Sequence, residues 1–235
     1  MNPDHGDWNL TTIMKDKQNY CFEQNGAKID IFNSQVEQFV RKQTNAGDPF
    51  FLYAFYSQMT HENFNSFKMV DTIYANFIRK LAPSLKDTIL VFAGDHGPRY
   101  GSFAITALGR IEVKMPLVAM RIPDKLATTY PHLRMYLKAN SDRLVTWYDM
   151  HQMLKDAANL KFEADGFENF KTGPVSPWRQ LVPPSRSCVD ADIDPPYCYC
   201  DDKIGMSLKE PLAKHACVLV VKYGKCTNSQ VMVIV

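Results

Sequence analysis

The sequence has no long apolar run, and this absence excludes one class of protein. No stretch of the 235 residues is long and apolar enough to cross a membrane as a helix, so we expect no membrane span in this chain. Nor is there a basic run, because 27 lysines and arginines are interspersed with 25 acidic residues, for a net charge of +2. We therefore expect no nucleic-acid partner. The composition gives no sign of the oligomeric state.

The first residues also lack the pattern of a signal peptide, since the chain starts MNPDHGDWNLTT. The cysteines, in contrast, favour a protein of an oxidising compartment. An even count with a cluster in the last quarter of the chain favours disulfides, and hence the secretory pathway or the extracellular space, with 15 pairings open. Reduced surface thiols are the alternative. A missing N-terminal segment would reconcile the two observations, so we expect an incomplete chain. The six cysteines are Cys21, Cys188, Cys198, Cys200, Cys217 and Cys226.

The most informative feature is a short apolar run that ends in Gly-Asp-His-Gly. Residues 88–92 read TILVF, a pattern typical of a strand buried on both faces of a parallel sheet. The next loop places Asp95 and His96 at the carboxyl end of this strand, where α/β sheets hold their ligands. Carboxylate oxygen and imidazole nitrogen are natural donors to a divalent metal. Asp95 and His96 are therefore candidate metal ligands. The alternative is that Asp95 caps a turn and His96 packs locally.

A second apolar run, residues 50–56, reads FFLYAFY and predicts another buried strand. A polar loop that contains His61 follows it. Loops at the carboxyl ends of neighbouring parallel strands lie along one edge of a sheet, so we expect His61 to approach Asp95 and His96. Arg99 follows the pair closely and is a candidate contact for an anion, with a surface salt bridge as the alternative.

Helical periodicity over residues 27–44, 67–81 and 147–160 predicts amphipathic helices around these strands. Thr146 is the expected N-cap of the last one. Asp149 then lies in the first helical turn, where a carboxylate suits the helix dipole, so we interpret it as structural. Shorter elements are expected at residues 116–121 (strand), 131–137 (helix) and 230–235 (strand).

The order of strand, helix and strand with short links describes βαβ units. Residues 1–165 therefore predict an α/β domain with a layered, mostly parallel sheet. The character of the chain changes afterwards, because residues 173–202 are rich in proline, cysteine and aspartate. For residues 166–235 we predict a Cys-rich appendage that is dominated by loops and stapled by disulfides.

Several segments also carry a family pattern in a fixed order, and together they resemble the DUF229 family. That family is placed in the alkaline phosphatase and sulfatase superfamily, and the likeness is to its C-terminal portion. The segments are PFFLYAFYSQMTHENFN (49–65), DTILVFAGDHGPRYG (87–101), KMPLVAMRIPD (114–124), NSDRLVTWYDMHQML (140–154) and SRSCVDADIDPPYCYC (185–200).

The resemblance implies an alkaline-phosphatase-like sheet and a divalent metal (calcium, zinc or manganese) that holds a phosphate or sulfate ester. Asp95 and His96 match the late metal-binding pair of the superfamily. His61 matches a histidine that touches the anion or the leaving group, which makes it the candidate catalytic residue, and Arg99 is the candidate substrate contact. The superfamily's nucleophile and first acidic ligands lie on earlier strands. We therefore expect an incomplete hydrolase that lacks its nucleophile. A non-catalytic secreted binding protein on the same scaffold is the alternative.

Overall fold

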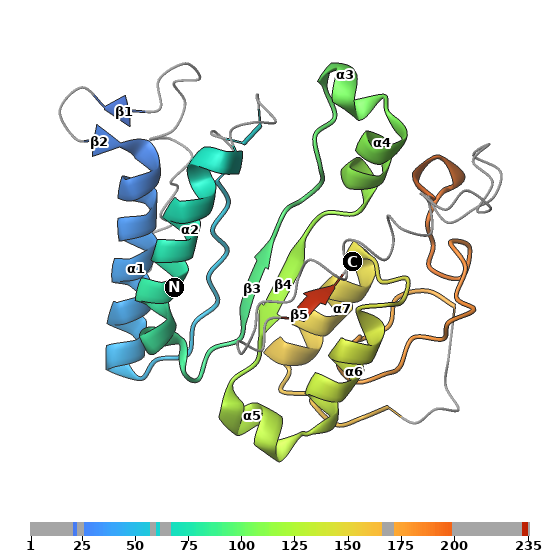
Figure 1. The fold of residues 1–235 in the computed structure, drawn as a ribbon. Helices are drawn as coiled ribbons and strands as arrows, with labels where there is room; N and C mark the ends of the chain where they lie inside the picture. The colour runs from blue at the N-terminus through green and yellow to red at the C-terminus, as the bar shows by residue number, and fades with distance from the viewer. Residues whose placement is uncertain are drawn as a thin grey trace, which may run out of the picture. The chain divides into compact units, whose positions relative to one another are not determined.

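The chain divides into two units, Met1–Lys86 and Asp87–Val235, and each is described here by itself (Figure 1). A computed structural model describes residues 21–22, 26–56, 60–61, 67–165, 172–198 and 232–234.

The first unit is built on two packed helices, α1 (Lys28–Ala46) and α2 (Phe67–Leu81), which were both predicted. A two-residue antiparallel pair, β1 (Cys21–Phe22) with β2 (Gly26–Ala27), leads into α1. The buried residues of α1 recur at helical spacing, and Ile29 packs against Val70 of α2. Gly47 ends α1 in the left-handed conformation (φ 73°), where it donates its N–H to the last turn. The 3₁₀ helix η3 (Ala82–Leu85) follows α2.

The apolar run at residues 50–56 differs from its prediction as a buried strand. It forms no strand within the described part of the chain. Its alternate side chains Phe51, Tyr53 and Phe55 are 77, 75 and 52 % exposed. The reason is that an apolar run becomes a buried strand only where a neighbouring strand supplies hydrogen bonds and both faces are covered. Tyr56, at the end of the run, packs its ring 5.2 Å from that of Phe32.

The second unit contains a three-stranded sheet in the order β3-β4-β5 (Figure 1). β3 (Leu90–Ala93) pairs antiparallel with β4 (Val118–Arg121), so that Leu90 faces Arg121. β5 (Met232–Ile234) pairs antiparallel with the other side of β4. Strands were predicted near all three places. Both described pairings in this unit are antiparallel, and a layered, mostly parallel sheet stays a prediction.

Helices connect and cover this sheet. Two of them, α3 (Gly101–Ala104) and α4 (Ala107–Lys114), lie between β3 and β4 and were not predicted. Three more follow β4, and α6 and α7 correspond to predicted helices. They are α5 (Asp124–Thr129), α6 (His132–Asn140) and α7 (Trp147–Ala158). A 3₁₀ helix, η5 (Pro195–Tyr197), lies near the end of the described chain.

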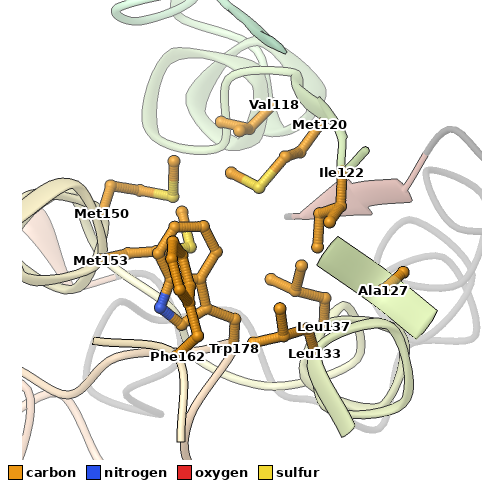
Figure 2. Packing of buried hydrophobic residues seen from close by; sticks show 10 residues of the cluster. All are labelled: Val118, Met120, Ile122, Ala127, Leu133, Leu137, Met150, Met153, Phe162 and Trp178. Carbon is orange, nitrogen blue, oxygen red and sulfur yellow. The ribbon is translucent and has the colours of Figure 1, made fainter. Parts of the chain in front are cut away.

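The core of the second unit lies between one face of β4 and the helices α6 and α7 (Figure 2). Alternate residues of a strand point to the same face, and Val118 and Met120 of β4 are accordingly buried together. Trp178 is 1 % exposed, and its ring lies edge-on to Phe162 with the ring centroids 5.6 Å apart. The described segment 172–198 thus contributes to this core, while a domain boundary at residue 165 stays a prediction. The remaining members of the cluster are Ile122, Ala127, Leu133, Leu137, Met150 and Met153.

Candidate functional site

Asp95 and His96 lie directly after β3, at the end of the strand that the sequence predicted to carry them. The N–H of Gly94 donates to the Leu117 carbonyl (2.9 Å), which continues the pairing with the chain before β4 by one residue. Beyond this bond the chain turns outward. The side chain of Asp95 is 58 % exposed and that of His96 is 32 % exposed, so both donors are accessible to solvent.

The two side chains are arranged by short hydrogen bonds within the turn. Asp95 Oδ1 accepts the backbone N–H of His96 (3.0 Å). His96 Nδ1 lies 2.8 Å from the carbonyl oxygen of Gly97, and a carbonyl only accepts, so we assign the ring proton to Nδ1. The lone pair of the neutral imidazole is then on Nε2. This atom lies 3.4 Å from Asp95 Oδ2.

This donor set fits one divalent cation. Two ligand bonds of ~2.1 Å that meet at a tetrahedral angle separate their donor atoms by ~3.4 Å. A histidine ligand commonly donates its second ring N–H to a backbone carbonyl, as His96 does to Gly97. The pair supplies two ligands, whereas protein metal sites normally use three or four. Within the described residues there is no group of three or more His, Cys, Asp and Glu side chains that would hold a metal ion.

Gly97 fixes the turn against the last part of α4. Its N–H donates to the Val113 carbonyl (3.3 Å). A Cβ atom at this position would collide with the backbone carbonyl of Glu112. Glycine is therefore required here, because the turn and α4 approach each other closely. Burial raises the pKa of the Glu112 carboxyl group above its usual value. The position of the Gly97 carbonyl, and with it the orientation of the His96 ring, therefore depends on α4.

The other two candidate residues are placed differently. Arg99 is exposed, and no carboxylate in the described ranges pairs with it. Its guanidinium lies in the same loop as Asp95 and His96 and is available to an anion. His61 is also exposed, but it belongs to the unit Met1–Lys86. Its expected approach to Asp95 and His96 stays a prediction.

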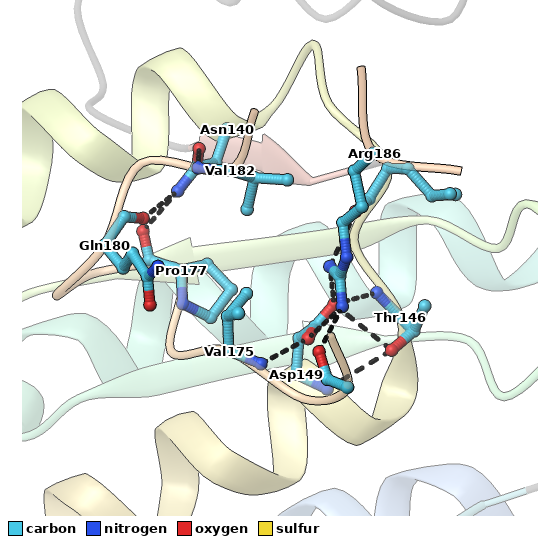
Figure 3. A network of polar contacts seen from close by, with 10 residues as sticks. Asn140, Thr146, Asp149, Val175, Pro177, Gln180, Val182 and Arg186 are labelled. Atoms are coloured by element: carbon cyan, nitrogen blue, oxygen red, sulfur yellow. Dashed lines mark hydrogen bonds and ion pairs between the residues drawn. The ribbon is translucent and has the colours of Figure 1, made fainter. Parts of the chain in front are cut away.

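A buried ion pair that the sequence did not predict joins α7 to the segment after residue 172 (Figure 3). Arg186 donates from Nη1 to Asp149 Oδ2 (2.7 Å) and from Nη2 to Oδ1 (3.0 Å), and neither side chain is exposed to solvent. Asp149 also accepts the N–H of Val175 (2.7 Å) and completes a capping box with Thr146. The structural interpretation of Asp149 is confirmed. No local pattern marks Arg186 as its partner, because the two lie 37 residues apart.

The segment 172–198 also contains a disulfide, which confirms the prediction from the cysteine pattern. Cys188 and Cys198 are bonded, and both are buried. The rest of the pairing stays open, since Cys200, Cys217 and Cys226 lie outside the described residues. The carbonyl of Pro196, within this disulfide loop, accepts a hydrogen bond from Lys114 Nζ at the end of α4 (2.9 Å). Among the described helices, none combines the length and the apolar character needed to cross a membrane.

Comparison with known proteins gives one result. A family model described as "Protein of unknown function (DUF229)" matches residues 6–229, which include all the segments quoted above from the sequence. No curated protein and no solved structure matches the chain.

Proposed function

The chain belongs to the DUF229 family, and from this premise we propose that it is a metal-dependent, hydrolase-like protein whose substrates are phosphate or sulfate esters. The placement of the family in the alkaline phosphatase and sulfatase superfamily, with its mostly parallel sheet, is part of the proposal. One observation carries it: the 3.4 Å separation of Asp95 Oδ2 and His96 Nε2 in an accessible loop after β3.

Each residue of the loop has a role in this proposal. The Gly97 carbonyl holds the proton on His96 Nδ1, and this leaves the Nε2 lone pair available to a cation. The Asp95 carboxylate contributes an oxygen ligand and a negative charge. A bound divalent metal ion offsets the charge of the ester and lowers the pKa of a bound nucleophile. The ion is calcium, zinc or manganese, in line with the oxygen and nitrogen donors of the pair.

Two more residues have roles in the proposed reaction. The guanidinium of Arg99 donates hydrogen bonds to the anionic oxygens of the ester, since arginine matches the geometry of phosphate and sulfate groups. His61 transfers a proton to the leaving oxygen, which is the role that an exposed imidazole performs in ester cleavage. We assign no residue of this chain as the nucleophile.

The disulfide supports a location in the secretory pathway or outside the cell. Disulfides form and persist in oxidising compartments and are rare in reducing ones. The bond between Cys188 and Cys198 is buried, as expected of a structural disulfide rather than an exchanging one.

The first experiment measures metal binding alone. We expect calorimetric titration of the whole chain with zinc, calcium and manganese to show micromolar binding of at least one ion. Asp95→Asn and His96→Gln each remove one of two ligands, and we expect each to weaken that binding by at least about tenfold, or about 1.4 kcal/mol. His151→Gln is the matched control, because His151 is exposed on α7. Absence of binding at millimolar metal, or equal binding by all four proteins, contradicts the metal site.

The second experiment separates catalysis from binding. The same four proteins are assayed with p-nitrophenyl phosphate and p-nitrophenyl sulfate in the presence of the ion that binds. Turnover that is lost in the Asp95 and His96 variants and retained in His151→Gln supports a hydrolase. Metal binding without turnover of either ester contradicts the hydrolase and supports the alternative, a binding protein on the same scaffold.

A further inference from the structure

A cavity of about 380 Å³ lies in the second unit between α6 and the segment 180–184. One wall carries Tyr136, Ala139 and Asn140, which lie on one face of α6, and Arg143, which follows the end of this helix. The opposite wall runs from Gln180 to Pro184 and includes two consecutive prolines. The volume falls in the range of small-molecule sites, which is roughly 300–1,000 Å³.

Asn140 holds the two walls at a fixed separation (Figure 3). Its side chain is fully buried. Nδ2 donates to the carbonyls of Pro177 and Gln180 (both 2.7 Å), and Oδ1 accepts the N–H of Val182 (2.8 Å). One carboxamide thus joins α6 to residues 177–182 through three hydrogen bonds. The cavity is therefore formed before any ligand arrives, which lowers the free-energy cost of binding.

Gln180 brings an unpaired polar group to this cavity. The residue is only 9 % exposed, and its backbone groups are bonded, but its side-chain carboxamide has no hydrogen-bond partner in the described part of the chain. Its amide atoms are not among the described side-chain atoms that are both buried and unpaired, so they reach the solvent in the cavity. The carboxamide is therefore available to hydrogen-bond a ligand in place of water.

Arg143 brings a positive charge that is not balanced. It is partly buried, and its guanidinium donates to the carbonyl of its neighbour Asp142 (3.3 Å), while no carboxylate of the described residues pairs with it. The acid on the same cavity, Asp165, is already engaged by Arg179. Of the two ionic groups that line the cavity, Arg143 is therefore the one available to an anionic ligand.

We propose that this cavity binds a small organic carboxylate with an apolar body. Arg143 takes the carboxylate, because a guanidinium forms two parallel hydrogen bonds with it, and the Gln180 carboxamide donates a further one. Val182, Pro183 and the ring of Tyr136 surround the apolar body. A single cation between apolar walls favours a monoanion over a phosphate dianion. This site uses no residue of the Asp95–His96 loop and goes beyond the function proposed above.

The test uses phenylacetate and hexanoate as probes and phenylacetamide as the uncharged control. Proton–nitrogen correlation spectra of the whole chain are recorded during each titration, up to about 10 mM, which corresponds to the weak affinity expected of such small ligands. We expect saturable shifts of the backbone amides of Arg143 and Val182 with both carboxylates. Phenylacetamide should bind at least about tenfold more weakly, because it lacks the charge that Arg143 matches.

Variants then assign the binding to the named side chains. Arg143→Gln and Gln180→Ala should each weaken phenylacetate binding, the former by at least about tenfold. Arg110→Gln is the matched control, since Arg110 is an exposed arginine on α4 outside the cavity. Near-ultraviolet circular dichroism confirms that each variant keeps the native core. The absence of saturable shifts with either carboxylate, equal binding by Arg143→Gln, or equal binding of phenylacetamide overturns the proposal and leaves the metal site untouched.

Discussion

Replacing Asp149 with alanine removes the carboxylate that joins the start of α7 to the segment after residue 172. Five contacts are lost: two from Arg186, one from the Val175 N–H and two from the N–H and hydroxyl of Thr146. Among the described residues, the completely buried guanidinium of Arg186 then keeps the carbonyls of Leu144 and Gly173 as its partners. An uncompensated buried charge is the main penalty.

The magnitude follows from the burial of both partners. Removing one member of a buried ion pair costs about 3–5 kcal/mol, and the lost N-cap interactions fall within that figure. The free energy of unfolding of a domain is about 5–15 kcal/mol, so Asp149→Ala should remove a large part of it. For a unit of this size, we expect the melting temperature to fall by about 6–20 °C.

The assay is urea unfolding followed by tryptophan fluorescence, because Trp178 is buried in the core of the same unit. Asp142→Ala is the control. Asp142 is an exposed acid close in sequence, and its removal should change the free energy of unfolding by no more than about 0.5 kcal/mol. The double variant Asp149→Ala/Arg186→Met removes both charges, so it should be less destabilised than the sum of the single variants. A cost below about 1 kcal/mol for Asp149→Ala, or strict additivity in the double variant, refutes the reasoning.

Two further predictions concern the disulfide and an ion pair between α1 and α2. Replacing Cys188 and Cys198 by serine opens a short loop and should lower the free energy of unfolding by about 2–3 kcal/mol in urea; a reducing agent should destabilise the natural chain more than it destabilises the variant, and an equal effect on both contradicts the assignment. Lys80, together with Arg41, lowers the pKa of Glu37, so the stability from this carboxylate is present above its unfolded pKa and is lost as the pH falls through its folded pKa. Lys80→Met should therefore raise the pKa of Glu37 in an NMR titration; an unchanged value contradicts the assignment.

Local signals were sufficient for the long helices. Phe67–Leu81 was predicted with the bounds that α2 has, since its periodicity is strong and Pro83 follows it. Thr146 marked the start of α7, and its side chain does accept the Asp149 N–H. The short helix α4 was missed, although Thr106 caps it. Gly109 is its third residue, and a helix of eight residues shows little periodicity.

The apolar run at residues 50–56 shows the limit of such signals. Its composition predicts a buried strand, but composition does not say which neighbour covers it. Tyr53 and Phe55 are exposed in the unit as described, and their rings stack on each other with centroids 6.3 Å apart. The sequence likewise placed Asp95 and His96 after β3, but it did not reveal that Gly97 orients the imidazole, because that depends on contact with α4.

The buried hydrogen-bond networks around Asn140 and Arg186 could not be predicted from the sequence. Each joins residues about forty positions apart, and neither sits in a pattern with a fixed spacing. A buried carboxamide or guanidinium has the same local sequence signature as an exposed one. Only the folded chain shows that Asn140 pairs with backbone groups of residues 177–182 and that Arg186 pairs with the Asp149 carboxylate.

The contacts of Asn140 and Arg186 affect how the protein tolerates cleavage of its backbone. A protease cut between Asp165 and Gly173 would leave Trp178 held in place through Asn140, Asp149 and the core, so the nicked protein should stay assembled under native conditions. A recombinant fragment that stops at Asp165 lacks that advantage. Its core would lack the indole ring of Trp178, and the buried carboxylate of Asp149 would lack Arg186 as its counterion. We therefore expect this fragment to precipitate. Expression designs for this unit should therefore extend at least to Cys198.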